Sequence, residues 1–246
     1  MSRLRCFIFN ADESGFNSDP TRVRAIGEKG KCLSRVSGGS GRESTIVLAC
    51  IAADGTFLPP FIIYKGAAVQ ARWISEKCFQ GTLYGASNNG WIEEPHFYQW
   101  FIKLFIPHIQ SLRTKMILPD QTAMLLFDVH SSHFSVRIIE GELISKIELV
   151  RFPSHLTGRI QPLDKCIFGP LKTLWDKLLV EHGKTQIGLA NSRLSREKFA
   201  EMIGTVWPDG MTKKNIISGF ETTGIYPVDS TKFSKEFFDP VLLKKI

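Results

Sequence analysis

The sequence predicts an α/β fold, in which a mixed β-sheet is flanked by helices and followed by a helical C-terminal extension. The first half of the chain contains short apolar runs with the length of strands, and the last third contains apolar residues at helical spacing. The resulting order of strand, hairpin, helix, two strands and helices is typical of a mixed sheet. With 246 residues, 43% of them apolar, the chain is long enough to bury a large core.

Three apolar runs near the start of the chain predict strands. Residues 5–10 form the first, and residues 45–53 and 57–64 flank an Asp-Gly pair at 54–55, which favours a two-residue hairpin turn. The two prolines at 59–60 remove two amide donors from the second arm of this hairpin. Either this arm is an edge strand or its pairing begins after the prolines.

The middle of the chain predicts a helix and then two further strands. Pro107 is expected to end or kink the helix, and residues 124–127 and 148–152 are the apolar runs that predict the strands. The helix is predicted from five apolar side chains at helical spacing, which would cover one face of the sheet: Phe97, Trp100, Phe101, Leu104 and Phe105.

The C-terminal third is predicted to be mainly helical. An apolar stripe runs along residues 171–179, and two shorter helices are expected at 196–207 and 212–220. Thr212 stands where an N-cap is needed for the last of these helices.

Composition limits the class of protein. The net charge of +7 favours a polyanionic partner, although many folded domains carry a similar charge. The five cysteines are widely spaced and form no Cys-x-x-Cys pair, so neither a disulfide framework nor a cysteine zinc site is predicted. No uncharged apolar stretch reaches the roughly 18 residues of a membrane span, and we expect a soluble intracellular protein.

Three aspartates are the main candidate functional residues. Asp12, Asp128 and Asp164 each follow an apolar run that predicts a strand or a strand-to-helix junction. Sites in open sheets gather at the carboxyl ends of strands, and carboxylates gathered there suit Mg²⁺ and phosphodiester chemistry. The alternative for any single aspartate is a solvated surface charge, and the fold decides whether the three side chains meet.

Two histidines follow Asp128 closely, at positions 130 and 133. His130 and His133 have the spacing of a metal-binding pair on a helix, but no third histidine or cysteine completes a zinc site. We expect them to orient water, hold phosphate or cap a helix beside the carboxylates. A nucleophile pair of Ser131 and His155 is disfavoured because no Gly-x-Ser-x-Gly motif is present.

Three sequence motifs resemble a known family. The motifs are Asn-Ala-Asp-Glu-Ser-Gly-Phe at 10–16, Phe-Asp-Val-His-Ser-Ser-His at 127–133, and Gln-Pro-Leu-Asp-Lys-Cys-Ile-Phe-Gly-Pro-Leu-Lys at 161–172. They are similar to the acidic motifs of the DDE superfamily endonucleases, in the pogo, Tigger and jerky branch of mariner-like transposases. The resemblance also includes residues 58–60 and 223–227, and extends from about residue 6 to 228.

The resemblance implies a ribonuclease H-like domain at residues 1–180, built on a mixed five-stranded sheet, with a helical extension at 181–246. Asp12 would end the first strand, Asp128 would end the fourth, and Asp164 would begin the helix after the fifth. Two Mg²⁺ or Mn²⁺ ions would be held by the three acids, with Asp12 shared by both ions, and no covalent enzyme intermediate would form. Side chains expected to support the ligands or the substrate are Glu13, His130, His133, His155 and Gln161.

The resemblance implies that DNA is the partner and that the protein is nuclear, and it leaves a homodimer open. A basic segment between residues 17 and 42 would contact the phosphate backbone, unless it is only a solvated face. The basic side chains in question are Arg22, Arg24, Lys29, Lys31, Arg35 and Arg42.

The tandem helix-turn-helix region that recognises transposon ends in full transposases has no counterpart in the chain. Departures from the family motifs are also present, at Val129, Ser154 and Gly158. Two functions are therefore carried forward: a metal-dependent endonuclease and strand-transfer domain, or a catalytically inactive, domesticated protein that binds nucleic acid and regulates.

Overall fold

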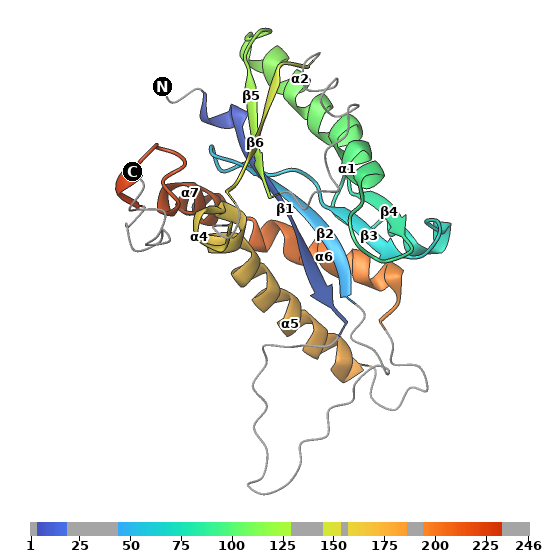
Figure 1. Ribbon diagram of the computed structural model, residues 1–246. Coiled ribbons are helices and arrows are strands. Elements are labelled where there is room, and N and C mark those ends of the chain that lie inside the picture. Colours follow the sequence, from blue (N-terminus) through green and yellow to red (C-terminus); the bar gives the residue numbers. More distant parts are fainter. Residues whose placement is uncertain (1–3, 19–43, 129–144, 154–156, 186–193, 233–246) are drawn as a thin grey trace, which may run out of the picture.

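In a computed structural model, the chain forms a mixed sheet with helices on both faces (Figure 1). The structure describes residues 4–18, 44–128, 145–153, 157–185 and 194–232. Within these ranges the sheet has six strands in the order β4-β3-β2-β1-β5-β6. Their bounds are β1 Ile8–Asn17, β2 Ser44–Ala52, β3 Phe61–Lys65, β4 Leu83–Ser87, β5 Ala123–Phe127 and β6 Ile147–Arg151.

One strand runs against the other five. β2 pairs antiparallel with β1 and β3, whereas the β1–β5, β5–β6 and β3–β4 pairs are parallel. The carboxyl ends of β1, β3, β4, β5 and β6 therefore point to the same edge of the sheet. This is the arrangement that brings residues following different strands together.

The described sheet has six strands where five were expected. The additional strand is β4, which was not predicted from the sequence. This strand contains Gly85 and Ala86, which have low β-propensity and give no apolar alternation. The ring of Phe61 on β3 lies over Gly85, where an added Cβ would come within 3.0 Å of the ring. Packing by the neighbouring strand therefore replaces the missing side chain, and Asp128 follows the fifth strand in chain order instead of the fourth.

The end of β1 was also predicted wrongly. β1 continues to Asn17, so Asp12 lies inside the strand instead of at its end. The polar segment after residue 11 remains extended because β2 pairs with it, with Asp12 opposite Ala49 and Ser14 opposite Val47. Pairing with a buried neighbour outweighs the low β-propensity of Asp and Gly.

The chain turns at Asp54-Gly55 as predicted, although three residues, 53–55, and not two lie between the hydrogen-bonded pair Ala52 and Thr56. Asp54 accepts hydrogen bonds from the backbone N–H and the hydroxyl of Thr56 at 2.9 and 2.6 Å, and Gly55 has a φ of 92°, which suits glycine. Pairing begins before the prolines, with Phe57 opposite Ile51 and the N–H of Leu58 bonded to the Cys50 carbonyl at 2.9 Å, and it resumes in β3 at Phe61, directly after Pro60. β3 has a partner on each side and is not an edge strand.

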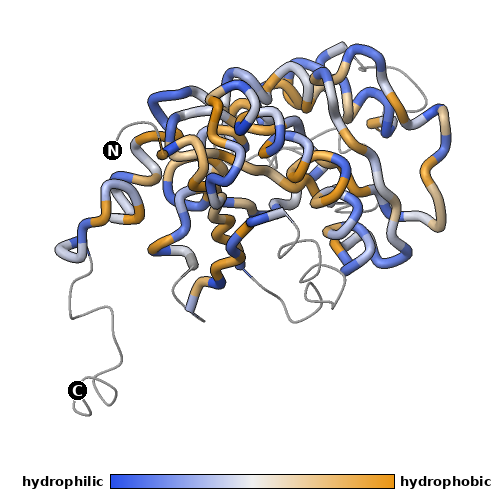
Figure 2. Tube along the Cα trace, turned by 90° about the horizontal axis from the view of Figure 1, so that it is seen from above, coloured by the Kyte–Doolittle hydropathy of each residue, from blue (hydrophilic) through white to orange (hydrophobic). Residues whose placement is uncertain are grey.

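Helices cover the two faces of the sheet, and each face has its own apolar core. One face carries α1 (Glu94–Trp100), the π-helical turn η3 (Phe101–Phe105) and α2 (Ile106–Met116). The other face carries α5, α6 and α7. Short apolar and hydrophilic stretches alternate along the trace, as expected where each element buries one side (Figure 2). Bounds on the second face are α4 Thr157–Ile160, η5 Leu163–Ile167, α5 Phe168–Thr185, α6 Arg196–Gly210 and α7 Lys213–Thr222.

The helix predicted over residues 97–105 does not end at Pro107. It passes through the π-helical turn η3 and continues as α2, with Pro107 near the start of α2. Proline lacks an N–H and clashes with the carbonyl four residues earlier, which here belongs to Lys103 within η3. The widened π turn accommodates this proline without ending the helix.

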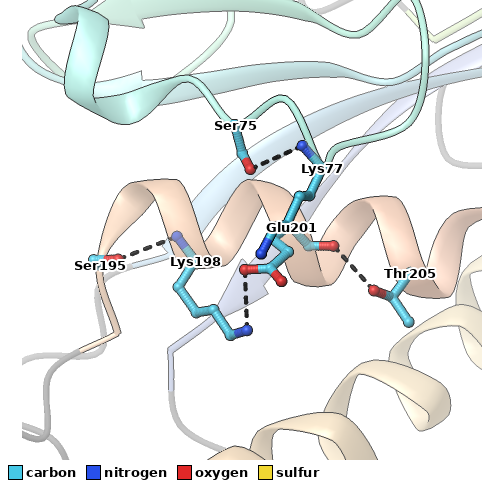
Figure 3. A network of polar contacts seen from close by, with 6 residues as sticks. All are labelled: Ser75, Lys77, Ser195, Lys198, Glu201 and Thr205. Carbon is cyan, nitrogen blue, oxygen red and sulfur yellow. Dashed lines mark hydrogen bonds and ion pairs between the residues drawn. The ribbon is translucent and has the colours of Figure 1, made fainter.

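A polar network fixes the start of α6 beside the segment that follows β3 (Figure 3). Ser195 caps the helix by accepting a hydrogen bond from the backbone N–H of Lys198 at 3.1 Å, and the Lys198 ammonium pairs with Glu201 at 3.0 Å. The Lys77 side chain from the neighbouring segment extends toward Glu201. Its positive charge contributes, after the hydrogen bond from Lys198, to lowering the pKa of the Glu201 carboxyl.

Candidate functional site

Three separate elements position the three predicted acids. Asp12 lies on β1 and is half-buried, Asp128 follows the last residue of β5, and Asp164 lies in η5, the first turn of the helix after β6. β1 and β5 are parallel neighbours, and their last registered pair is Ala11 with Phe127. The next residue on each strand is an acid, so Asp12 and Asp128 are adjacent across the sheet.

The charges of these acids are coupled. Burial raises the pKa of Asp12 well above its ordinary value, and the negative charges of Asp164, Glu13 and Asp128 raise it further. Like charges close together disfavour the ionised form of each other, and a buried carboxyl loses the solvation of its charge. The carboxylates of Asp12, Asp128 and Asp164 therefore lie close enough for their charges to affect one another.

The pKa of Asp164 is also raised. Partial burial of its carboxylate is the main cause, and the charge of Asp128 adds to it, whereas Lys172 and a hydrogen bond from Gln161 act in the opposite direction. Asp164 is more exposed than Asp12. Asp128 affects both neighbours, which places it within electrostatic reach of each.

Gln161 joins two of the acids directly. Its side-chain nitrogen Nε2 donates to Oδ2 of Asp12 at 2.5 Å and to Oδ2 of Asp164 at 3.2 Å. The side chain is 1% exposed, and its carbonyl oxygen Oε1 is buried without a hydrogen-bond partner among the described residues. One neutral amide therefore bridges the two carboxylates and leaves an unsatisfied oxygen beside them.

Asn10 is a site residue that the sequence reasoning did not single out. It is fully buried, and its Nδ2 donates to the backbone carbonyl of Leu126 at 3.1 Å, while its Oδ1 accepts from the backbone N–H of Leu163 at 3.0 Å. A signal was present, because asparagine is unusual inside an apolar strand and residues 10 and 12 share a face of β1. The side chain thus connects β1 and β5 to the helix that carries Asp164.

The donor set fits a hard divalent cation. Carboxylate oxygens and an amide oxygen are the ligand types that Mg²⁺ and Mn²⁺ prefer, and the buried Oε1 of Gln161 lacks a partner. In the described part of the chain, no three His, Cys, Asp or Glu side chains already stand in a metal-holding arrangement. The Gln161 amide instead occupies the position between Asp12 and Asp164, where a cation would offset their charges.

Of the remaining predicted residues, the structure describes Glu13 alone. Glu13 follows Asp12 on β1 and pairs with Leu48, so its side chain points to the opposite face of the sheet. The other candidates lie outside the described residues: His130, His133, His155, Arg22, Arg24, Lys29, Lys31, Arg35 and Arg42.

The fold is of the ribonuclease H-like class, with a mixed sheet flanked by helices. A family model described as DDE superfamily endonuclease matches residues 41–220. The chain therefore belongs to the DDE superfamily endonuclease family, as its motifs predicted.

Relatives of this chain include transposon-derived proteins. The Jerky protein of Mus musculus is 30% identical over 135 residues, which cover 52% of this chain and 22% of that protein. The human pogo transposable element with ZNF domain is 26% identical over 177 residues, covering 72% of this chain and 12% of that protein. A Cochliobolus lunatus protein named MFS-type transporter clz9 is 23% identical over 227 residues, covering 90% of this chain and 23% of that protein.

The chain spans less than a quarter of the length of each of these three relatives. Their names, transporter included, refer to those whole proteins and describe much more than the shared segment. Among the residues that the structure describes, none of the helices has the length and apolar character needed to cross a membrane.

Solved structures agree on the fold. The pre-cleavage Mos1 transpososome superposes with a TM-score of 0.58 at 12% identity, covering 97% of this chain and 58% of that one. The Mos1 mariner paired-end complex with Mn superposes with a TM-score of 0.56 at 12% identity, covering 90% of this chain and 53% of that one. The shared fold extends through the helical C-terminal part of the chain.

Proposed function

We propose that this chain is a metal-dependent DNA endonuclease and strand-transfer domain of transposon origin, in which Asp12, Asp128 and Asp164 are the metal ligands and catalytic residues. The carrying observation is that Gln161 donates to both Asp12 and Asp164 while Asp128 is electrostatically coupled to each. Residues separated by about 150 positions in sequence are thereby assigned to one site.

Asp12 is proposed to be the ligand shared by two ions, with Asp128 and Asp164 each holding one. When bound, two Mg²⁺ or Mn²⁺ ions supply charge stabilisation at a phosphodiester and activate water or a DNA 3′-hydroxyl as the nucleophile. Family membership and the Mn in a solved Mos1 paired-end complex support this choice of ions. A nearby cation favours the ionised acids and so opposes the effect of their mutual repulsion.

The chain's own residues prepare the site. The Gln161 amide keeps the Asp12 and Asp164 carboxylates facing one point, and its Oε1 is available as a further oxygen donor when the amide turns. Roles in orienting water or substrate are proposed for His130, His133 and His155.

DNA is the proposed substrate, and we place the chain in the nucleus. The Mos1 neighbours are a transpososome and a paired-end complex with a transposon end, which also supports a homodimer. Contacts to the phosphate backbone are assigned to the basic segment, that is to Arg22, Arg24, Lys29, Lys31, Arg35 and Arg42.

Two structural parts are proposed for this activity: a catalytic part at residues 1–180 and a helical extension at 181–246 packed on it. The packing is extensive, since one apolar core includes Phe16 of β1, Trp175 of α5, Trp207 of α6 and Phe220 of α7. The extension is therefore expected to be required for a stable site.

The test is nicking of supercoiled plasmid by the whole chain with Mg²⁺ or Mn²⁺. Asp12→Asn, Asp128→Asn and Asp164→Asn should each abolish nicking, as should EDTA, whereas Glu148→Gln should retain it. Glu148 is a matched control because it is an exposed acid on the neighbouring strand β6. Nicking that survives all three aspartate changes and EDTA would overturn the proposal.

A second candidate is an inactive, domesticated protein that binds nucleic acid and regulates. It is favoured by the departures from the family motifs at Val129, Ser154 and Gly158. This candidate predicts DNA binding that weakens steeply with salt, through release of counterions, and no nicking with any divalent metal.

A further inference from the structure

We propose that Asn10 is a positioning residue that sets Asp164 in register with Asp12 and Asp128. The inference rests on the proposed function, because it concerns the same three acids. The buried Asn10 side chain bonds the backbone of Leu126 and of Leu163. Each acid lies one or two residues after one of these three positions: Asp12 after Asn10, Asp128 after Leu126, and Asp164 after Leu163.

The first anchor is a helix cap supplied from a distant strand. The N–H groups in the first turn of a helix have no partner inside the helix, and a polar side chain usually accepts from one of them. At the start of the helix that carries Asp164, Pro162 has no N–H and the N–H of Leu163 is bonded by Oδ1 of Asn10 at 3.0 Å. The capping side chain comes from 153 positions earlier in the chain.

The second anchor is on β5. Nδ2 of Asn10 donates to the carbonyl of Leu126 at 3.1 Å, which is a bond in addition to the ladder that pairs the two strands. The amide is planar, so its acceptor and its donor have a fixed relative orientation. Rotation of the helix start would therefore break one of the two bonds, and both lie in an environment that excludes water, with Asn10 0% exposed.

The helix start is also packed against α7. Gly219 of α7 lies against Pro162, where an added Cβ would come within 3.0 Å of the Pro162 carbonyl oxygen. Backbone packing by α7 and the hydrogen bond from Asn10 thus fix the segment between them, which contains the bridging Gln161. Substitution at Gly219 gives a way to move this segment without changing the sheet.

The residue type matters at position 10. Aspartate would keep an acceptor for Leu163 but would lose the donor to Leu126 and add a buried negative charge. Leucine has a similar volume and removes both bonds. Serine is too short for its hydroxyl to reach both the Leu126 carbonyl and the Leu163 N–H. Asparagine is the side chain of this size that supplies both a donor and an acceptor.

The experiment compares Asn10→Leu, Gly219→Ala and Asp164→Asn in the whole chain by Mn²⁺ titration calorimetry and by hydrogen exchange of the metal-free protein. Asn10→Leu is expected to weaken Mn²⁺ binding by about 10- to 100-fold, the usual effect of losing a residue that orients metal ligands. In the Asp164→Asn background the same change should have little further effect, because Asn10 acts through Asp164. Exchange should accelerate at the Leu163 amide, and Gly219→Ala should reproduce the loss of affinity.

The control is Trp207→Phe, which removes a different buried hydrogen bond, from the Trp207 indole to the Leu58 carbonyl at 3.2 Å. It should lower stability while leaving Mn²⁺ affinity unchanged. If the wild-type chain binds no Mn²⁺, the proposed function fails and this inference fails with it. If the wild type binds and the losses from Asn10→Leu and Asp164→Asn are additive, or Leu163 exchange is unchanged, only the inference is overturned.

Discussion

The indole N–H of Trp175 donates to the backbone carbonyl of Asn17 at 2.9 Å. Trp175 lies on α5, about three turns beyond Asp164, and Asn17 is the last residue of β1. The helix and the strand that carry two of the acids are therefore joined at a second point, away from the acids themselves. The indole also packs edge-on against Phe16 and Phe199, at centroid distances of 5.5 and 4.8 Å.

Removing this contact should lower stability in two steps. Trp175→Phe keeps an aromatic ring but loses the hydrogen bond, and the free energy of unfolding should fall by about 1–3 kcal/mol because the Asn17 carbonyl is left without its partner. Trp175→Ala adds a cavity and should cost about 3–5 kcal/mol. Urea denaturation measures both. Trp91→Ala, at a tryptophan that is 63% exposed, should change the unfolding free energy by only about 0.5 kcal/mol.

Two helical glycines should respond to alanine with opposite sign. An added Cβ at Gly204 of α6 would lie 2.7 Å from the backbone nitrogen of Phe79, which is too close for any real contact, so Gly204→Ala should destabilise by about 1–3 kcal/mol. Gly183 of α5 has nothing within 4 Å, and Gly183→Ala should stabilise by about 0.5–1 kcal/mol through reduced backbone entropy. Equal shifts of the two melting temperatures would contradict the close approach of α6 to residue 79.

Capping of α6 by Ser195 provides a third test. Ser195→Ala should cost about 1 kcal/mol, since the N–H of Lys198 loses its acceptor, whereas Ser195→Asp should restore most of the stability. Chemical denaturation followed by circular dichroism measures the difference. Unchanged stability in both variants would mean that the Lys77 and Glu201 side chains, and not the cap, hold the helix start in place.

Asp12 should make the metal-free protein less stable as pH rises. Its folded-state pKa is raised above the ordinary value that it has when unfolded, so the folded protein holds the proton more tightly. Its contribution to stability is therefore fully present below the unfolded pKa and is lost as pH rises through the folded pKa. In EDTA, wild-type stability should decline across this window.

Asp12→Asn should remove this decline, because the amide cannot ionise. At neutral pH the variant is expected to be more stable than the wild type, because the folded wild-type protein must ionise a carboxyl that is buried and close to like charges. Thermal unfolding from pH 4 to pH 8 gives the comparison, with Glu148→Gln as the control that should keep the wild-type slope. A variant that is more stable but has no nicking activity would show that the Asp12 carboxylate lowers stability and is needed for catalysis.

Local patterns predicted those parts of the fold that local interactions decide. Thr212 caps α7 by accepting from the N–H of Asn215 at 3.2 Å, as expected, and the stripe of aromatic residues starting at Phe97 is buried against the sheet. The Asp-Gly turn at 54–55 is confirmed for the same reason, since both residues act within the turn. Such features depend on neighbours in the sequence.

The remaining features depend on partners far along the chain. β1 extends past Asp12 because β2 pairs with it, and β4 forms on the edge of β3 despite its small residues. From its neighbours in sequence, Asn10 is only a polar residue within an apolar strand. Its role depends on the Leu126 carbonyl and the Leu163 N–H, which lie 116 and 153 positions away. Gln161 was predicted to support the metal ligands, but its sequence position did not indicate that it bridges two acids.

The central position of β1 has a consequence for the order in which the protein folds. Its first partner, β2, is nearby in sequence, but its other neighbour, β5, and the helix start that Asn10 caps come much later. Closing such long loops is slow, so non-local pairing limits the folding rate. A nascent chain that has emerged only as far as β5 can pair Asp12 beside Asp128, while the segment with Asp164 is still being made. We therefore expect Asp12 and Asp128 to meet first, and Asp164 to join them with the helices that form the second core.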